Sequence, residues 1–218
     1  MARANRHYIP GYVWHITHRC HQKEFLLKFA RDRKRWIDWL FEAKKRYGLT
    51  VLNYMVTYNH VHLLVYDNRG RESIPKSIQL IAGRTGQGYN LRKQRRGAFW
   101  EDRYHATAIE KGSHLKQCLV YIDLNMVRAG VVDHPQLWPF CGYNEIQNPP
   151  QRYRIIDLDS LTRLLGISNP NDFQSTHKRW VAASLSRGEI ERERDWTQSI
   201  AVGGKAFVEK FKESLGFR

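Results

Sequence analysis

The sequence is poor in cysteine, and its three cysteines form no recognisable ligand or disulfide pattern. Cys20, Cys118 and Cys141 are widely spaced, and none belongs to a Cys-x-x-Cys pair. An odd number of scattered cysteines argues against a disulfide framework and against a structural zinc site. This composition fits a reducing compartment, so we expect a cytoplasmic protein.

Long apolar runs are also missing. No stretch reaches the roughly 18 apolar residues that a membrane-spanning helix needs. The N-terminal "MARANRHYIPGY" has basic residues but lacks the apolar region of a signal peptide. Internal repeats and low-complexity segments are absent as well. We therefore expect no membrane partner, and the 218 residues suffice for one sizeable core with an appendage.

Acidic residues are scarce relative to basic ones. The chain holds 36 lysines and arginines against 21 aspartates and glutamates, which gives a net charge of +15. An excess of this size favours a polyanionic partner, most often nucleic acid.

Hydrophobic periodicity predicts an α+β fold. Strands are expected at 11–18, 50–58, 61–67 and 99–109, and helices at 29–47, 73–95 and 113–129. The resulting order, β-α-β-β-α-β-α, is the split βαβ pattern. It predicts a ferredoxin-like or RRM-like antiparallel sheet with helices on one face.

The chain divides into three parts in this interpretation. Residues 1–134 form the domain with the sheet, and the proline-rich residues 135–156 form a linker or a loop that wraps around it. Short helical patterns at 157–166, 170–186 and 204–215 then predict a small α-helical C-terminal region, residues 157–218.

The stretch "NHVHLLV" at 59–65 holds a candidate metal site. His60 and His62 lie two residues apart on a predicted strand, so their side chains share a face. Two neutral imidazoles can bind a divalent cation, but a working site needs another ligand from elsewhere. Taken alone, the pattern is a weak signal. His15 and His18 lie three apart on a strand and therefore cannot chelate one cation together.

The predicted helix 113–129 carries a polar stripe between two apolar faces, formed by Gln117, Tyr121, Asn125 and Arg128. Tyr121 and Asn125 are one turn apart and therefore adjacent. Asn125 is a candidate third ligand and Tyr121 a candidate nucleophile. A phenol with a pKa near 10 is a weak nucleophile, so it would need a cation on the phosphate that it attacks. The alternative is a tyrosine at the edge of the core beside a polar surface residue.

Four segments together resemble one known family. "NHVHLLV" resembles the His-hydrophobic-His motif of the HUH single-tyrosine transposases. "YIDLNMVRAG", "FWEDRYHATAI" and "WTQSIAVGGKAFVEKFKESLG" resemble the tyrosine helix, the preceding strand and the C-terminal segment of the REP-associated tyrosine transposases within that superfamily. The resemblance spans nearly the whole chain. Met126 departs from it, standing where proline is expected, so the helix need not kink there.

The resemblance implies metal-dependent cleavage and rejoining of single-stranded DNA. His60 and His62 would bind Mg²⁺ or Mn²⁺, with Asn125 as the third ligand. Tyr121 would attack the phosphate to give a 5′-phosphotyrosine and a 3′-OH, so Tyr121, His60 and His62 are the expected catalytic residues. The implied DNA is a REP-type hairpin with a flanking tetranucleotide. A monomer is expected, and a dimer that exchanges tyrosine helices is the alternative.

Basic residues near the N-terminus and after the second predicted helix, with two aromatic residues of the segment that follows, are candidate DNA contacts. Phosphates would meet Arg3, Arg6, Arg19, Arg92, Lys93, Arg95 and Arg96. Trp100 and Tyr104, interleaved with Arg103, would stack unpaired bases. Two alternatives stay open: the run 92–96 is a solvated loop, or Trp100 belongs to the core.

Two other functions compete with the enzyme. The same layout serves non-catalytic modules that bind hairpin DNA or RNA, which stack bases on aromatic residues of the sheet. That interpretation gives the histidine pair and the Tyr121–Asn125 stripe no role, and it expects an aromatic strand that we do not find. An inactive descendant that only binds hairpins is the third possibility, although His60, His62 and Tyr121 are all intact.

Overall fold

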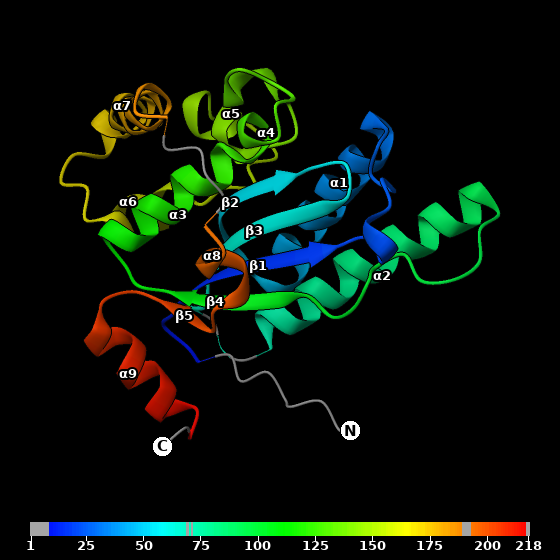
Figure 1. Ribbon diagram of the computed structural model, residues 1–218, viewed down its shortest axis with the longest axis horizontal. Helices are drawn as coiled ribbons and strands as arrows, with labels where there is room; N and C mark the ends of the chain where they lie inside the picture. Colours follow the sequence, from blue (N-terminus) through cyan, green and yellow to red (C-terminus); the bar gives the residue numbers. More distant parts are fainter. Residues whose placement is uncertain (1–8, 69, 71, 189–192, 217–218) are drawn as a thin grey trace.

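A computed structural model describes residues 9–68, 70, 72–188 and 193–216. A five-stranded sheet with the order β2-β3-β1-β4-β5 organises them (Figure 1). The strands are β1 Val13–Arg19, β2 Thr50–Val56, β3 His60–Tyr66, β4 His105–Ile109 and β5 Ala201–Val202. The first four pair antiparallel in the ferredoxin-like order, and β5 pairs parallel to β4. The predicted α+β fold class is confirmed.

Helices α1 Ala30–Tyr47 and α2 Ser73–Lys93 follow the two predicted helical ranges closely. Helix α1 buries Trp36, Leu40 and Ala43 at helical spacing, and it ends at Gly48, whose φ of 65° suits a residue without a side chain. The remaining helices are α3 Ser113–Asp123, α4 Asn125–Arg128, α5 Gly142–Gln147, α6 Leu158–Leu165, α7 Phe173–Ser186, α8 Asp195–Gln198 and α9 Lys205–Ser214. Short 3₁₀ turns occur at His21–Lys23, Pro135–Leu137 and Pro170–Asp172.

The two faces of the sheet carry different helices. Figure 1 shows α1 and α2 behind the sheet and α3 in front of it. Thr17 pairs with His62, and His15 with Leu64, so these side chains share the face that α3 covers. The Asn53 amide of β2 fixes α3 there by donating to Asp123 Oδ1 at 2.9 Å. The expectation of helices on one face thus holds for α1 and α2, and α3 leaves the opposite face partly open for a site.

The predicted helix 113–129 is divided in two. Helix α3 ends at Asp123, and Leu124, with ψ of 4°, separates it from α4. Arg128 donates a hydrogen bond of 2.5 Å to the Tyr121 carbonyl, the group that the Asn125 N–H would meet in a regular helix. A side chain that competes for this acceptor is a recognised cause of helix distortion. The predicted single helix 113–129 is therefore wrong at Leu124, where the chain bends although Met126 stands in place of proline.

The predicted strand 99–109 begins later than expected, at His105. Trp100 makes only an isolated bridge with Cys20, and the Phe99 carbonyl accepts from the His21 N–H. Residues 101–103 then turn outward, with the Asp102 carboxylate accepting from the Arg103 N–H. These bends place three polar residues beside the end of β1 instead of in the sheet.

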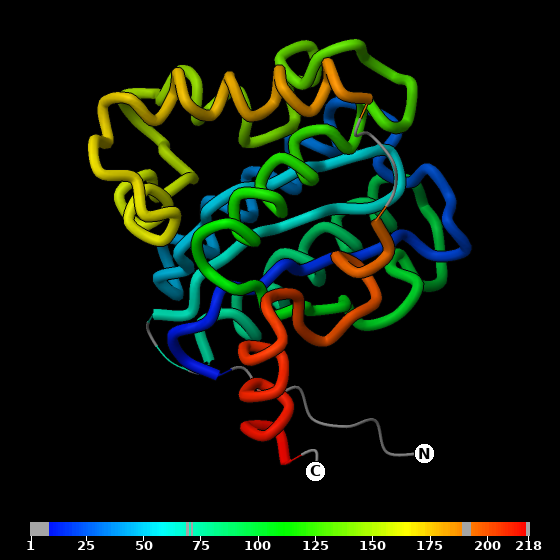
Figure 2. The backbone as a smooth tube through the Cα atoms, turned by 60° about the vertical axis from the view of Figure 1, so that its left-hand side comes forward, coloured from blue at the N-terminus to red at the C-terminus, as the bar shows by residue number. Residues whose placement is uncertain are grey.

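The C-terminal residues wrap around the sheet. Figure 2 shows α7 crossing above the strands and α9 lying below them. Within the wrapping segment, α5 packs beside β2, and Cys141 bridges to Met55. The predicted helices at 157–166, 170–186 and 204–215 correspond to α6, α7 and α9, but the strand β5 was not predicted. Among the described residues, no helix has the length and apolar character to cross a membrane.

Candidate active site

A cleft of about 420 Å³ lies at the end of the sheet where β1 finishes and β3 and β4 begin. Its walls come from the strands, from the junction of α3 and α4, from the turn at 101–103 and from α8. The lining residues are Thr17, His18, Arg19, His60, His62, Glu101, Asp102, Arg103, His105, Tyr121, Asn125, Arg128, Ala129, Thr197 and Gln198. The cleft therefore brings His60, His62, Tyr121 and Asn125 together, as the sequence predicted.

His62 lies beside each of the other three predicted catalytic and ligand residues. The ring centroids of His60 and His62 are 5.0 Å apart, and those of His62 and Tyr121 are 6.0 Å apart. The Asn125 Nδ2 atom lies 2.9 Å from His62 Nε2. His62 is 2% exposed and Tyr121 6% exposed, whereas His60 is half-buried at the cleft. Asn125, the first residue of α4, thus lies against the ring of His62.

The turn between β2 and β3 orients His60. Its Nδ1 atom lies 2.8 Å from Asn59 Oδ1 and 2.9 Å from Thr57 Oγ1. The Asn59 carbonyl oxygen can only accept, so Nδ1 carries the proton. The lone pair is then on Nε2, which is the state that a metal-binding imidazole needs.

His15 is a member of the site that the sequence did not predict. Its Nε2 atom lies 2.8 Å from His62 Nδ1, and its Nδ1 atom lies 2.8 Å from the Trp196 carbonyl oxygen. The planes of the two histidine rings are only 13° apart and the centroids are 5.0 Å apart, as an in-plane hydrogen bond between them requires. The alternation along β1 places His15 on the face of Thr17 and Arg19. In the sequence, His15 was compared only with His18, as a possible second ligand of one cation, and that comparison could not reveal a partner on β3.

Burial keeps both inner histidines uncharged. It lowers the pKa of His15 from 6.5 to about 3, against the raising effect of the Trp196 carbonyl. It also lowers the pKa of His62 well below 6.5, and the positive groups around it, His60 first, act in the same direction. Neutral imidazole is the form that binds a metal ion, so the site is ready for a cation at neutral pH.

Two side chains fix the position of Tyr121. The guanidinium carbon of Arg128 lies 4.0 Å from the centroid of the Tyr121 ring, and the Trp196 ring lies 6.0 Å from it on centroids. Arg128 was placed in the polar stripe by the sequence but was given no role there. A cation against the ring face is a favourable contact and also places positive charge beside the cleft.

Among the predicted DNA contacts, Arg19 and Arg103 line the cleft, and Arg3 and Arg6 lie outside the described residues. Arg92 forms an ion pair with the buried Asp32. Arg95 donates to the Ala98 carbonyl at 2.9 Å and lies 3.8 Å from Glu24, and the Lys93 ammonium lies over the Phe29 ring. Arg96 is exposed. The end of α2 extends beyond the sheet on the side of the cleft (Figure 1).

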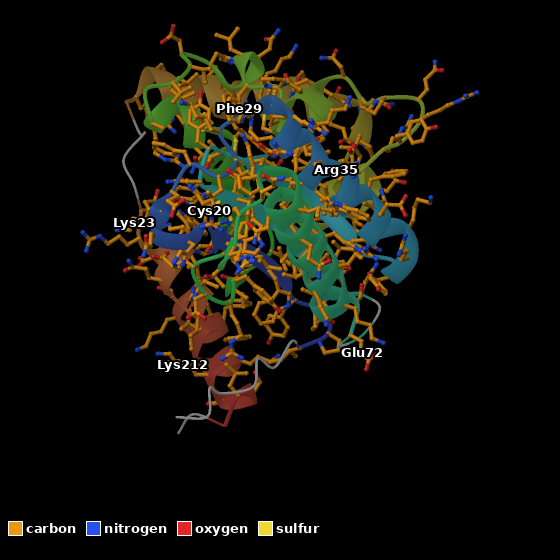
Figure 3. The ribbon with its side chains drawn as sticks, turned by 90° about the vertical axis from the view of Figure 1, so that its right-hand side faces the viewer. Cys20, Lys23, Phe29, Arg35, Glu72 and Lys212 are labelled. Atoms are coloured by element: carbon orange, nitrogen blue, oxygen red, sulfur yellow. The ribbon has the colours of Figure 1, made fainter. Side chains whose placement is uncertain are left out.

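The predicted stacking residues Trp100 and Tyr104 are both half-buried. The His18 ring stacks on Trp100 with centroids 4.1 Å apart, and the indole N–H donates to the Ala82 carbonyl of α2 at 3.0 Å. Tyr104 meets His18 edge-on. Figure 3 looks onto this end of the molecule, where Lys23, after β1, projects outward and adds a cation that the sequence had not singled out.

The donor set suits a divalent cation. No group of three or more His, Cys, Asp or Glu side chains that could hold a metal exists in the described part of the chain. The alternative set consists of His60, His62 and the amide of Asn125. Asn125 turns its Nδ2 toward His62 Nε2, and rotation of the amide brings Oδ1 to the same place. Two imidazoles and one amide oxygen then leave coordination positions open for a phosphate, as in metal sites that act on substrates. His60, His62 and Asn125 therefore fit a divalent cation.

Comparison with known proteins identifies the family of the chain. The family described as "Transposase IS200 like" matches residues 9–125, so the chain belongs to the IS200-like transposases. Comparison of the chain with curated proteins finds no match.

Two solved structures are similar to the chain. One is described as the "REP associates tyrosine transposase bound to a REP hairpin". It is 19% identical to this chain, and the aligned region covers 66% of this chain and 84% of the other, with a TM-score of 0.55. The fold is therefore that of a REP-associated tyrosine transposase. The other is described as a putative transposase from Deinococcus radiodurans. It is 17% identical, the aligned region covers 48% of this chain and 83% of the other, and the TM-score is 0.37.

Proposed function

We propose that the protein is a metal-dependent endonuclease and strand transferase of the HUH class, which acts on single-stranded DNA through Tyr121. The observation that carries this proposal is the convergence of Tyr121, His60, His62 and Asn125 in one cleft of one chain. Membership of the IS200-like transposases supports it. A nucleophile beside oriented neutral imidazoles is the arrangement that phosphoryl transfer to a side chain needs.

The reaction conserves the number of phosphate ester bonds. The Tyr121 hydroxyl oxygen attacks the phosphorus, the bond from phosphorus to the 3′-oxygen breaks, and a 5′-phosphotyrosine forms. The phenol loses its proton and the departing 3′-oxygen gains one. A 3′-OH, from the same or from another strand, reverses the exchange, so no external energy source is required.

His60 and His62, with the amide oxygen of Asn125, would hold Mg²⁺ or Mn²⁺, which when bound supplies the positive charge that stabilises the phosphate as it is attacked. Arg128 orients the Tyr121 ring from the cleft side. Burial of Tyr121 limits the positions that its hydroxyl can take, which reduces the entropy lost on attack.

The substrate in this proposal is a REP-type hairpin with a flanking tetranucleotide. The net charge of +15 and the cations at the cleft end of the sheet, Arg19, Lys23 and Arg103, support a DNA substrate. The likeness of the fold to a transposase whose structure holds a REP hairpin points in the same direction. The proposed place of action is the cytoplasm, which the free Cys20, Cys118 and Cys141 fit.

The proposed active unit is a monomer of three parts. Tyr121 meets His62 and His15 of its own chain, so no second copy is needed to complete the site. Residues 1–134 form the catalytic domain, 135–156 the wrapping segment and 157–218 the helical C-terminal region. Residues 195–202 of that region contribute to the cleft and to the sheet.

A covalent adduct tests the proposal. The full chain is incubated with single-stranded hairpin DNA that retains its flanks, in Mn²⁺ or Mg²⁺, and is run on a denaturing gel. We expect a protein–DNA adduct that disappears with chelator and with Tyr121→Phe, while binding to the hairpin persists. Tyr66→Phe, on the same sheet face at the far end of β3, should keep the adduct.

Two results would contradict the proposal. An adduct that survives Tyr121→Phe would exclude this tyrosine as the nucleophile. Binding without any adduct, over a panel of hairpins and both metals, would favour the non-catalytic module.

A further inference from the structure

A chain of hydrogen bonds connects α8 to the cleft through the interior of the sheet. The Trp196 carbonyl oxygen lies 2.8 Å from His15 Nδ1, His15 Nε2 lies 2.8 Å from His62 Nδ1, and His62 Nε2 lies 2.9 Å from Asn125 Nδ2. His15 is fully buried and His62 is 2% exposed. Each ring nitrogen of both histidines therefore has one defined partner.

The Trp196 end of this chain of hydrogen bonds fixes where the protons are. A carbonyl oxygen only accepts, so His15 Nδ1 carries a proton and Nε2 of the neutral ring accepts one. His62 must then donate from Nδ1, which leaves a lone pair on Nε2. The Asn125 side chain presents its Nδ2 to this lone pair, and rotation of the amide about its last bond would present Oδ1, so Asn125 adapts to the tautomer of His62 and does not set it.

We propose that His15, oriented by the Trp196 carbonyl, is a positioning residue that holds His62 in the tautomer able to bind a divalent cation through Nε2. The inference rests on the proposed function, which makes His62 a ligand. It adds that the state of this ligand is set from outside the residues 9–125 that match the family, since Trp196 belongs to the C-terminal segment.

The position of the Trp196 carbonyl does not depend on His15 alone. Thr107 Oγ1 donates to the Ser199 carbonyl at 2.7 Å and to the Trp196 carbonyl at 3.3 Å. His105 Nε2 lies 3.0 Å from the same Ser199 oxygen. Two side chains of β4 therefore hold the segment on the sheet. Because His105 also holds the segment, a variant of Thr107 removes one buried hydrogen-bond donor beside the chain and leaves the Trp196 carbonyl and both histidines in place.

Without its acceptor at Nδ1, the His62 proton can move to Nε2 and occupy the lone pair that a cation needs. The partners that orient metal-binding histidines typically change metal affinity by about 10–100-fold when they are removed. A purely structural His15 would instead change the stability of the fold without changing the tautomer of His62.

Nitrogen-15 NMR of the histidine rings reads the tautomer directly, in the metal-free full chain at neutral pH. We expect the wild-type spectrum to place the His62 proton on Nδ1. His15→Phe should move at least part of the His62 population to the Nε2–H form. In His15→Gln, the side-chain oxygen can accept from His62, so this variant should retain the Nδ1–H form.

Binding of Mn²⁺ alone, followed by calorimetry, gives the second measurement. We expect His15→Phe to weaken Mn²⁺ binding by about 10–100-fold, His15→Gln to restore much of it, and Thr107→Val to bind within about twofold of the wild type. Wild-type His62 in the Nε2–H form, or equal Mn²⁺ affinity for His15→Phe and wild type, would overturn the inference. If His15→Phe does not fold, the wild-type spectrum and His15→Gln decide the question.

The NMR result separates this inference from the proposed function. The expected tautomer without any adduct on DNA would remove the catalytic assignment and leave the hydrogen-bond chain established. An adduct together with the Nε2–H tautomer would support the catalytic assignment and overturn the role given to His15.

Discussion

At the scale of single residues, His15 and His62 are neutral bases enclosed at the floor of the cleft. An unfolded chain can protonate them near pH 6.5, whereas the folded chain resists protonation because burial disfavours the charged ring. Folding and proton binding are therefore opposed in acid.

We expect the free energy of unfolding of the metal-free protein to fall as the pH drops below 6.5. Between that value and the folded-state pKa of about 3 for His15, the unfolded state binds a proton that the folded state does not. Stability is thus complete above pH 6.5 and is lost on acidification, by about 2 kcal/mol for His15 at pH 5. Urea unfolding between pH 8 and pH 5 measures it.

The variant His15→Gln provides the control, because glutamine does not titrate in this range. Its unfolding free energy should depend less steeply on pH than that of the wild type, by up to about 1.4 kcal/mol per pH unit. If the unfolding free energies of the two proteins fell in parallel with pH, His15 would not be the source of the pH dependence.

The sequence disclosed the residues that we propose to act directly and missed the residue that we propose to orient one of them. His60 and His62 share a face by strand periodicity, and Tyr121 and Asn125 are neighbours by helix periodicity, so each pair could be predicted alone. Their convergence required the resemblance to a family. The role of His15 depends on the pairing of β1 with β3 and on a carbonyl at Trp196, and neither leaves a mark in local sequence.

At the scale of elements, α3 is fixed by a buried polar network as well as by apolar packing. Asp123 accepts from Asn53 of β2 at 2.9 Å and lies 2.8 Å from His177 Nε2 of α7. Gln147 of α5 lies 2.8 Å from the other nitrogen of His177. The side chains of Asp123 and His177 are fully buried. One carboxylate, two residues after Tyr121, thus joins the tyrosine helix to the sheet and to the C-terminal helices.

Replacement of Asp123 by alanine should lower the free energy of unfolding by about 3 kcal/mol, because the buried Asn53 amide and the His177 N–H would lose their acceptor. Asp159→Ala removes an exposed carboxylate from α6 and should cost at most about 1 kcal/mol. Urea unfolding of both variants at neutral pH compares them. Equal losses would mean that the network adds no stability beyond a surface charge.

Element boundaries were predictable where local chemistry sets them. Gly48 ends α1 as expected, because the left-handed backbone conformation that ends a helix is a local property of glycine. The break at Leu124 depends on the Arg128 side chain reaching back to a carbonyl, and the late start of β4 depends on His18 and Cys20 of another strand. Strand β5 has only two residues, which is too short for any periodicity.

At the scale of the whole molecule, the charge of +15 predicts that DNA binding weakens steeply with salt. Arg96 is exposed at the end of α2, whereas Arg92 is engaged with Asp32. We expect Arg96→Ala to reduce the slope of log K against log salt by about 0.7 to 0.9. Fluorescence anisotropy with a labelled hairpin between low and moderate salt measures it.

Arg92→Ala is the matched comparison for that slope. It should alter the slope less than Arg96→Ala does and should instead lower stability, because Asp32 would be left buried without its cation. An unchanged slope for Arg96→Ala would remove the end of α2 from the DNA-binding surface.

Both margins of the antiparallel sheet are closed by chain from beyond residue 125. On one side β5 pairs with β4, and on the other Cys141 and Ile156 bridge to Met55 and Val51 of β2. Bare strand margins invite pairing between molecules. A chain trimmed to the residues shared with the family would expose two such margins at once and would associate with copies of itself. The segment beyond residue 125 thus does for this sheet what a second molecule would otherwise do, which supports the proposed monomer.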